Sequence, residues 1–242
     1  MGGLGNQLFQ IATAYAYSKE HNKQLIVDAS WWSAGQGVYP LEYKNSIFKN
    51  FEFGTNFGET CARIEEIGPI IYEELPGYSG HVSLNGYFQS PKYFKKYFEE
   101  FKNELWFPNV DTSFILEKNV AFHIRRGDYI QFPHIYGVCG VEYFNKMFDI
   151  FSDYQVNVFT DSPNPVLEEF KHRTFNLIQT SSELNDFTLM SLHENMVCSN
   201  SSFSWWASQL GKMKEKIMVP NKWLLTYNSD DIYVNNMTLV EV

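Results

Sequence analysis

The stretch VAFHIRRGD at residues 120–128 decides the fold of this chain. Its first five residues are apolar or aromatic apart from one histidine, which is typical of a short buried strand. Two arginines, a glycine and an aspartate follow directly, so this strand ends in a polar turn. The later segments alternate in pattern, with helices expected over 141–151 and 166–171 and strands over 156–160 and 175–179. This alternation predicts parallel βαβ units and an α/β fold.

The same alternation continues toward the C-terminus. Asp186 is placed to cap the N-terminus of a helix that ends near residue 195. We expect a strand over 196–198, and then a helix that opens at the serine-rich stretch 199–202 and runs through 210. The last strand is expected over 216–219, where Pro220 stops it. Connections between such parallel strands are right-handed crossovers.

The N-terminal stretch GGLGNQ at residues 2–7 predicts a glycine-rich loop, followed by a buried helical stripe over 8–16 and a strand over 24–28. The loop lacks the third glycine and the preceding strand of a dinucleotide-binding fingerprint. It also lacks the Gly-Lys-Ser/Thr of a P-loop. Gly3 and Gly5 therefore indicate only that the backbone closely approaches another group here.

Composition bounds the function. The 242 residues are 44% hydrophobic and 19% charged, as in ordinary globular proteins, and the net charge of −9 argues against a general affinity for nucleic acid. Three distant cysteines (Cys61, Cys139 and Cys198) form no CxxC pair, which favours a reducing compartment. We see neither a secretory signal nor an apolar run of about 18 residues. A cytoplasmic location is expected, free or peripheral at a membrane.

Polar residues follow three predicted strands, at 125–128, at Asp161 and at 199–202. The carboxyl ends of parallel strands share one sheet edge, where ligands bind in open α/β sheets. The fork of Arg125 suits phosphate oxygens, and Asp128 can orient that fork. The serines offer hydroxyls beside free helix N–H groups, which also suit an anion. The plainer interpretation is a surface ion pair and an ordinary helix cap.

A metal site is not predicted. His123 lies within a strand, where a lone histidine is more often a satisfied core residue than a ligand. The stretch HENMV at residues 193–197 fails the HExxH pattern at its last position. The serines at 199–202 lack the GxSxG context of a nucleophile elbow.

Four stretches together resemble the α-1,2-fucosyltransferases of glycosyltransferase family 11. They are GGLGNQLFQ at 2–10, HIRRGDY at 123–129, VFTDS at 158–162 and NDFTLMSLHENMVCSNSSFSWWA at 185–207. GYFQSPKYF at 86–94 fits the sequence between the two halves. The resemblance runs from residue 2 to about 223 and implies a GT-B-like fold, with two Rossmann-type halves that face a cleft. We expect an acceptor half at 1–118, which lacks its usual first strand, and a donor half at 119–242.

The resemblance implies metal-independent, inverting transfer of L-fucose from GDP-β-L-fucose to the 2-hydroxyl of a terminal galactose on a glycan. No cofactor is expected. Arg125 would hold the donor diphosphate, and Asp128 is a candidate base, unless it only orients Arg125 or a diphosphate oxygen takes the proton. The expected substrate-binding residues are His123 and Asp186 near the guanosine, Asp161 in the same pocket, Ser201 and Ser202 at the phosphates, and Arg126, Gly3, Gly5, Asn6 and Gln7.

Several alternatives stay open. The same donor can serve another linkage or acceptor, and the missing first strand leaves room for a non-catalytic relic that only binds a GDP-sugar. An NAD-dependent enzyme is disfavoured by the defective glycine fingerprint and by the arginine pair. A lectin-like binder, suggested by the 17% aromatic content, would bind glycans without GDP.

Overall fold

The computed structural model describes residues 2–30, 39–55, 62–127, 129, 134–137 and 139–242, and it divides into two compact units. Unit 1 spans residues 1–108 and 229–233, and unit 2 spans residues 109–228 and 234–242. The division falls after Pro108, whereas the sequence placed it after residue 118. A short segment near the C-terminus also belongs to unit 1, which the sequence did not indicate.

Unit 2 contains a six-stranded sheet in the order β10-β9-β8-β5-β6-β7, in which every neighbouring pair is parallel. This confirms the expected α/β class. The strands are β5 Asn119–Ile124, β6 Gln155–Thr160, β7 Asn176–Ile178, β8 Asn195–Val197, β9 Lys216–Pro220 and β10 Met237–Val240. The expectation that 216–219 forms the last strand was wrong. β10 is a four-residue edge strand in which only Val240 is buried, so its sequence pattern is too short to indicate a strand by itself.

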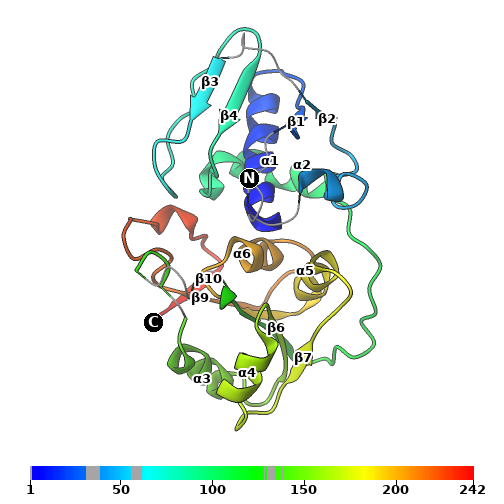
Figure 1. The fold of residues 1–242 in the computed structure, drawn as a ribbon, viewed down its shortest axis with the longest axis vertical. Coiled ribbons are helices and arrows are strands. Elements are labelled where there is room, and N and C mark those ends of the chain that lie inside the picture. Colours follow the sequence, from blue (N-terminus) through cyan, green and yellow to red (C-terminus); the bar gives the residue numbers. More distant parts are fainter. Residues whose placement is uncertain (1, 31–38, 56–61, 128, 130–133, 138) are drawn as a thin grey trace. The chain divides into compact units, whose positions relative to one another are not determined.

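Helices cover both faces of this sheet (Figure 1). Alternate residues of β5 point to opposite faces, so Phe122 packs 4.8 Å from the ring of Phe148 while His123 faces Phe203 at 5.6 Å. The first face carries α3 Val141–Ile150 and α4 Pro163–Glu169, and the second carries α5 Glu183–Leu192 and α6 Ser202–Gln209. Both Trp205 and Trp206 are buried. The helix pattern of the sequence is therefore confirmed, apart from the cap of α5.

The N-terminal cap of α5 is Ser182 and not Asp186. The Ser182 hydroxyl accepts from the Asn185 N–H at 3.2 Å, as serine does at this position. Asp186 lies in the first turn, and its Oδ1 accepts from the Thr180 N–H at 3.2 Å. The carboxylate thus supports the turn before the helix.

Unit 1 begins with α1 Leu4–Glu20, so most of GGLGNQ forms the first helical turn and not a loop. Twelve of the 17 helical residues are buried, and this packing outweighs the low helix propensity of glycine. Two parallel two-stranded sheets follow, one of β1 Val27–Asp28 with β2 Phe53–Gly54 and one of β3 Ala62–Glu65 with β4 Val82–Asn85. Two short 3₁₀ turns, Pro91–Tyr93 and Lys95–Tyr97, lead into α2 Phe98–Glu104.

The segment 229–233 completes unit 1. Asp231 accepts from the Tyr72 N–H at 2.8 Å and forms an ion pair with Lys92. The neighbouring Ile232 is fully buried. A loop after β3 and a turn after β4 are therefore both attached to a segment more than a hundred residues away along the chain.

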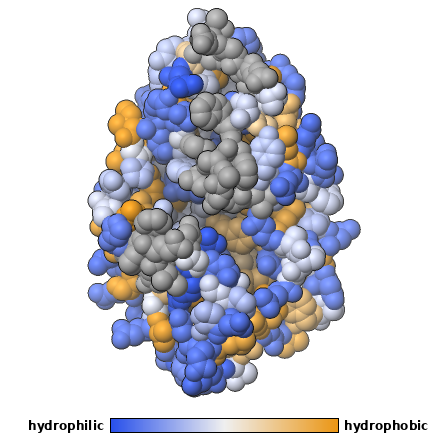
Figure 2. Space-filling model, viewed as in Figure 1, coloured by the Kyte–Doolittle hydropathy of each residue, from blue (hydrophilic) through white to orange (hydrophobic). Residues whose placement is uncertain are grey.

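Within the described ranges, no helix combines the length and hydropathy that a membrane span needs. On the face shown in Figure 2, the described residues are mostly hydrophilic and the hydrophobic ones form separate groups.

A buried histidine sits at the end of α5. His193 is fully buried, its Nδ1 lies 2.8 Å from the Leu189 carbonyl, and its Nε2 lies 2.9 Å from the Asn157 amide nitrogen. The carbonyl can only accept and the amide nitrogen can only donate, so the proton of the neutral ring is on Nδ1. Burial lowers the pKa of His193 to about 4. The fold therefore requires the uncharged ring.

This histidine should make the protein sensitive to acid. The unfolded chain binds a proton at His193 below pH 6.5 while the folded chain does not until about pH 4, so stability is lost as the pH falls through this window. Within this window, one buried neutral histidine lowers the free energy of unfolding by about 1.4 kcal/mol for each unit by which the pH falls. Urea unfolding at pH 6.5 to 5 should show a shallower pH slope in His193→Gln. A wild-type slope in His193→Gln would contradict this assignment.

Candidate functional site

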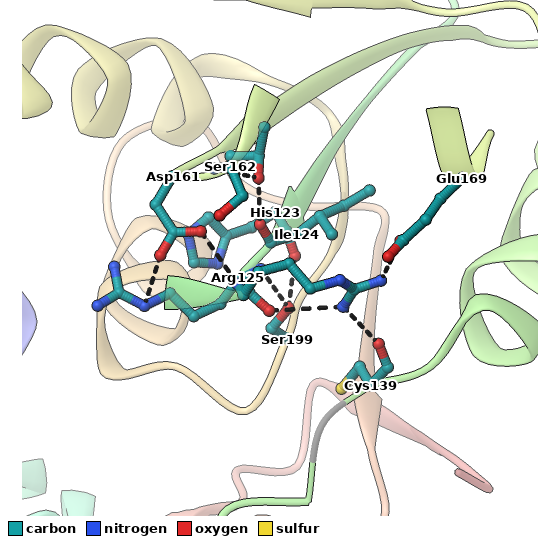
Figure 3. Close-up of polar contacts among 10 residues, drawn as sticks. His123, Ile124, Arg125, Cys139, Asp161, Ser162, Glu169 and Ser199 are labelled. Atoms are coloured by element: carbon teal, nitrogen blue, oxygen red, sulfur yellow. Dashed lines mark hydrogen bonds and ion pairs between the residues drawn. The ribbon is translucent and has the colours of Figure 1, made fainter. Parts of the chain in front are cut away.

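One carboxylate holds the turn that follows β5. Asp161 follows β6, and the parallel register that pairs Ile124 with Thr160 brings it beside this turn. Its Oδ1 accepts from the Arg126 N–H at 3.0 Å, and its Oδ2 lies 3.0 Å from the Arg125 Nε (Figure 3). The Arg125 side chain remains 36% exposed, and its guanidinium carbon lies 5.8 Å from the ring centre of Tyr129. Asp161 therefore orients the Arg125 guanidinium. The sequence suggested Asp128 for this role, but Asp128 lies outside the described residues.

Gly127 is required by this arrangement. Its φ is +22°, and a Cβ at this position would lie 2.3 Å from the Asp161 Oδ2. The carboxylate cannot move aside without breaking its bonds to the turn, because both oxygens are engaged. A side chain at residue 127 would therefore disturb the placement of Arg125.

Ser199 joins the ends of β8 and β5. Its hydroxyl accepts from the Arg125 N–H at 3.0 Å and donates to the His123 carbonyl at 2.8 Å. Sequence reasoning selected Ser201 and Ser202 and missed this role of Ser199. A small hydroxyl residue directly after a central strand is the signal that could have indicated it.

Arg126 points to the other side of the turn. Its guanidinium donates to the Cys139 carbonyl at 2.7 Å and to a Glu169 carboxylate oxygen at 2.6 Å, and its side chain is only 4% exposed (Figure 3). The terminal nitrogens of Arg126 are bonded inside the protein, and its expected contact with substrate stays a prediction. The expectation that the two arginines face different ways agrees with this geometry.

The remaining expected residues of unit 2 lie around the start of α6. His123 is 6% exposed, and burial, reinforced by Arg125, lowers its pKa to about 3, so the ring is neutral. Among the described residues its buried Nδ1 has no hydrogen-bond partner. Ser201 is the N-cap of α6 and is buried, and Ser202 is the first helical residue.

Asp186 directly precedes Phe187, which belongs to an aromatic pair next to His123. The Phe203 ring lies next to His123, and it meets Phe187 edge-on at 5.2 Å between ring centres. Burial raises the pKa of the neighbouring Asp186. A half-buried carboxylate is thus next in sequence to one ring of an aromatic pair, and the other ring of that pair lies beside the neutral imidazole.

The residues expected in the first stretch all belong to unit 1. Gly3 is the N-cap of α1, Gly5 and Gln7 are buried, and Asn6 is half-buried in the first turn. The Gln7 Nε2 donates to the Gly2 carbonyl at 3.0 Å. In the part of the chain that the structure describes, no group of three His, Cys, Asp or Glu side chains could hold a metal ion.

The contact between Gly127 and Asp161 predicts a stability difference between two glycine variants. Gly127→Ala should lower the free energy of unfolding by about 1–3 kcal/mol, because the new methyl group displaces the Asp161 carboxylate. Gly140→Ala is the matched control, since a Cβ there meets nothing within 4 Å. Urea unfolding measures both. Equal stability of the two variants would show that Asp161 is free to move.

The sequence comparisons with a family model and with two curated relatives all give glycosyltransferases. The Glycosyl transferase family 11 model matches residues 76–236. An Alpha-1,2-colitosyltransferase of Escherichia coli is 27% identical over 271 residues, which cover 92% of this chain and 90% of that protein. The O-antigen biosynthesis glycosyltransferase WbnK of Escherichia coli is 31% identical over 128 residues, which cover 48% of this chain and 42% of that protein. A crystal structure of POFUT1 in complex with GDP-fucose aligns with a TM-score of 0.46 and 14% identity, over 88% of this chain and 93% of that one.

The family match spans well over half of the chain and includes all three strand ends that form the site around Arg125. The resemblance found in the sequence is thereby confirmed, and the chain belongs to glycosyl transferase family 11.

Proposed function

We propose that this glycosyltransferase moves L-fucose from GDP-β-L-fucose to the 2-hydroxyl of a terminal galactose, with inversion at the transferred carbon. The observation that carries the proposal is the Arg125 guanidinium, which Asp161 holds half-exposed at the carboxyl edge of the sheet. The α-1,2 linkage is supported by the name of the Escherichia coli relative, an Alpha-1,2-colitosyltransferase. The acceptor sugar is proposed from the family resemblance alone.

Charge is the main demand of the reaction. The acceptor oxygen bonds to C1 of fucose from the face opposite the diphosphate, the bond from C1 to the phosphate oxygen breaks, and GDP leaves with its bonding electrons. Arg125 can bind two diphosphate oxygens as this charge grows. The first N–H groups of α6, with Ser202, add donors of the kind that bind phosphate at helix N-termini.

The acceptor proton needs a destination. Asp128 is our candidate base, and a diphosphate oxygen of the leaving GDP is the alternative. Metal-independent transfer remains a prediction from the resemblance.

The guanosine would lie beside His123 and Asp186. A carboxylate can accept from both the ring N–H and the adjacent exocyclic amino group of guanine. GDP-mannose and GDP-fucose share this pair of donors, whereas adenine has no ring N–H beside its amino group. His123 is neutral, so its ring offers hydrogen bonds without adding charge. Asp161 is assigned a supporting role here, because its two oxygens are bonded to the arginine turn.

GDP-colitose is the second candidate donor, since the relative that matches most of the chain is named as a colitosyltransferase. Colitose differs from fucose by the loss of the 3-hydroxyl group. A site that bonds this hydroxyl would reject colitose strongly, whereas a site that merely encloses the sugar would accept both.

Donor selectivity tests the proposed function directly. We expect calorimetry to show binding of GDP-fucose, weaker binding of GDP-mannose and no binding of NAD. Product analysis with lactose as the acceptor should then show an α-1,2-fucosylated trisaccharide. Preference for GDP-colitose would show that colitose, and not fucose, is the transferred sugar. Tight binding without transfer to any galactoside would favour the non-catalytic protein that only binds a GDP-sugar.

Arg125→Ala should reduce kcat on the order of 100- to 1000-fold, because a charge-stabilising donor is lost. Arg125→Lys should restore little, since an ammonium lacks the bidentate fork. Arg173→Ala removes an arginine that is paired with Asp149 elsewhere in unit 2, and it should keep normal turnover. GDP release measures all three. Activity of Arg125→Ala within a few-fold of wild type would overturn the assignment.

A further inference from the structure

Two amide side chains of unit 1 meet at the start of α1. The Gln89 Nε2 donates to the Asn6 Oδ1 at 2.6 Å, across 83 residues of sequence. Gln89 follows β4, and Asn6 lies in the first turn of the helix. Both side chains are half-buried. This bond joins two of the stretches that carry the family resemblance, GGLGNQLFQ and GYFQSPKYF.

The Asn6 amide is also held from its nitrogen side. Gly2 has a φ of +77°, and a Cβ there would lie 2.4 Å from the Asn6 Nδ2. The amide nitrogen therefore occupies space that only a glycine leaves open. With its oxygen bonded to Gln89 and its nitrogen packed over Gly2, the amide has one defined orientation.

The turn that carries Gln89 is itself fixed by a carboxylate. Glu66 accepts from the Tyr87 N–H at 2.7 Å and from the Phe88 N–H at 2.9 Å. Phe88 is buried at a φ of +51°, an uncommon backbone conformation for a bulky residue. Gly86 allows the carboxylate to approach, because a Cβ there would lie 2.8 Å from a Glu66 oxygen.

The turn that carries Gln89 contains a strained residue, Phe88, and is held by the Glu66 carboxylate. Strained backbone persists only where its surroundings hold it, and it concentrates at sites that need a defined geometry. Here the strained turn held by Glu66 carries Gln89, whose amide bonds the side chain of the half-buried Asn6.

We propose that Gln89 and Glu66 are positioning residues, which fix the Asn6 amide as a preorganised contact for the substrate. The proposal rests on the proposed function and on the expectation, implied by the family resemblance, that Asn6 binds substrate. Gln89 sets the polarity of the amide directly, and Glu66 acts through the turn 87–89. Preorganisation of this kind affects kcat more than stability, because a misplaced contact costs catalysis even when the fold is intact.

Gln89→Met tests the proposal, because methionine keeps the length of the side chain but donates no hydrogen bond. We expect kcat to fall on the order of 10-fold with little change in KM for GDP-fucose and an unchanged melting temperature. Gln10→Met is the matched control, since the Gln10 Nε2 donates at 3.0 Å to the main-chain oxygen of the same Asn6. It should keep the wild-type kcat. Equal kcat in Gln89→Met and Gln10→Met would overturn the proposal.

Polarity gives a second test. A carboxylate can only accept, so Gln89→Glu should turn the Asn6 amide around and reduce kcat further than Gln89→Met. Wild-type kcat in Gln89→Glu would mean that Asn6 donates to residue 89, which overturns the orientation. Glu66→Gln keeps the shape but loses one acceptor, and it should reduce kcat with the same unchanged KM.

Turnover of the wild-type chain and of Gln89→Met, measured side by side, distinguishes failure of this inference from failure of the proposed function. Turnover by the wild-type chain with normal turnover by Gln89→Met would reject the inference alone. Absence of turnover by the wild-type chain with any GDP-sugar would reject both. In a chain labelled with ¹⁵N-asparagine, the side-chain amide signals of Asn6 should shift in Gln89→Met but not in Gln10→Met. Unchanged Asn6 signals would overturn the positioning role even if kcat fell.

Discussion

The carboxylate of Asp161 is the constraint on which the candidate site depends. It bonds two consecutive residues at once, the main-chain N–H of Arg126 and the side chain of Arg125. The parallel register of β5 and β6 brings it there, and the absence of a side chain at Gly127 leaves room for it. Ser199 secures the other side of the turn from β8. Three strands thus determine the direction of one guanidinium, and a loop alone could not hold it so firmly.

Several buried titratable groups of unit 2 are uncharged. Burial keeps both His123 and His193 neutral, with the pKa of each far below its usual value. Burial also raises the pKa of the Cys139 and Cys198 thiols to about 11 and about 12, so neither carries charge. Arg126 is buried but paired with Glu169. Arg125, which is ion-paired with Asp161, keeps 36% of its side chain exposed at this edge of the sheet.

Local pattern predicted most of the sheet and helices of unit 2. The apolar runs of β5 and β6 and the stripe of α3 are strong because these elements are buried by many neighbours. Three features emerged only with the structure, although the small hydroxyl residue just after β8 is a local signal for the first of them. The role of Ser199, the partners of Arg126 and the bond between Gln89 and Asn6 each join residues that are distant in sequence. Propensity also misled at the first turn of α1, where tertiary burial stabilises a helix through glycines.

The segment 229–233 affects how the molecule can be made. During synthesis, unit 1 emerges from the ribosome first, yet the carboxylate that bonds Tyr72 and Lys92 and the buried Ile232 arrive only after nearly all of unit 2. Until then, the nascent first unit lacks the side chain of Ile232 in its core and the ion-pair partner of Lys92. Folding cannot proceed strictly unit by unit from the N-terminus, as it does in many multidomain chains. A chain released before residue 229 would therefore contain an unfinished unit 1.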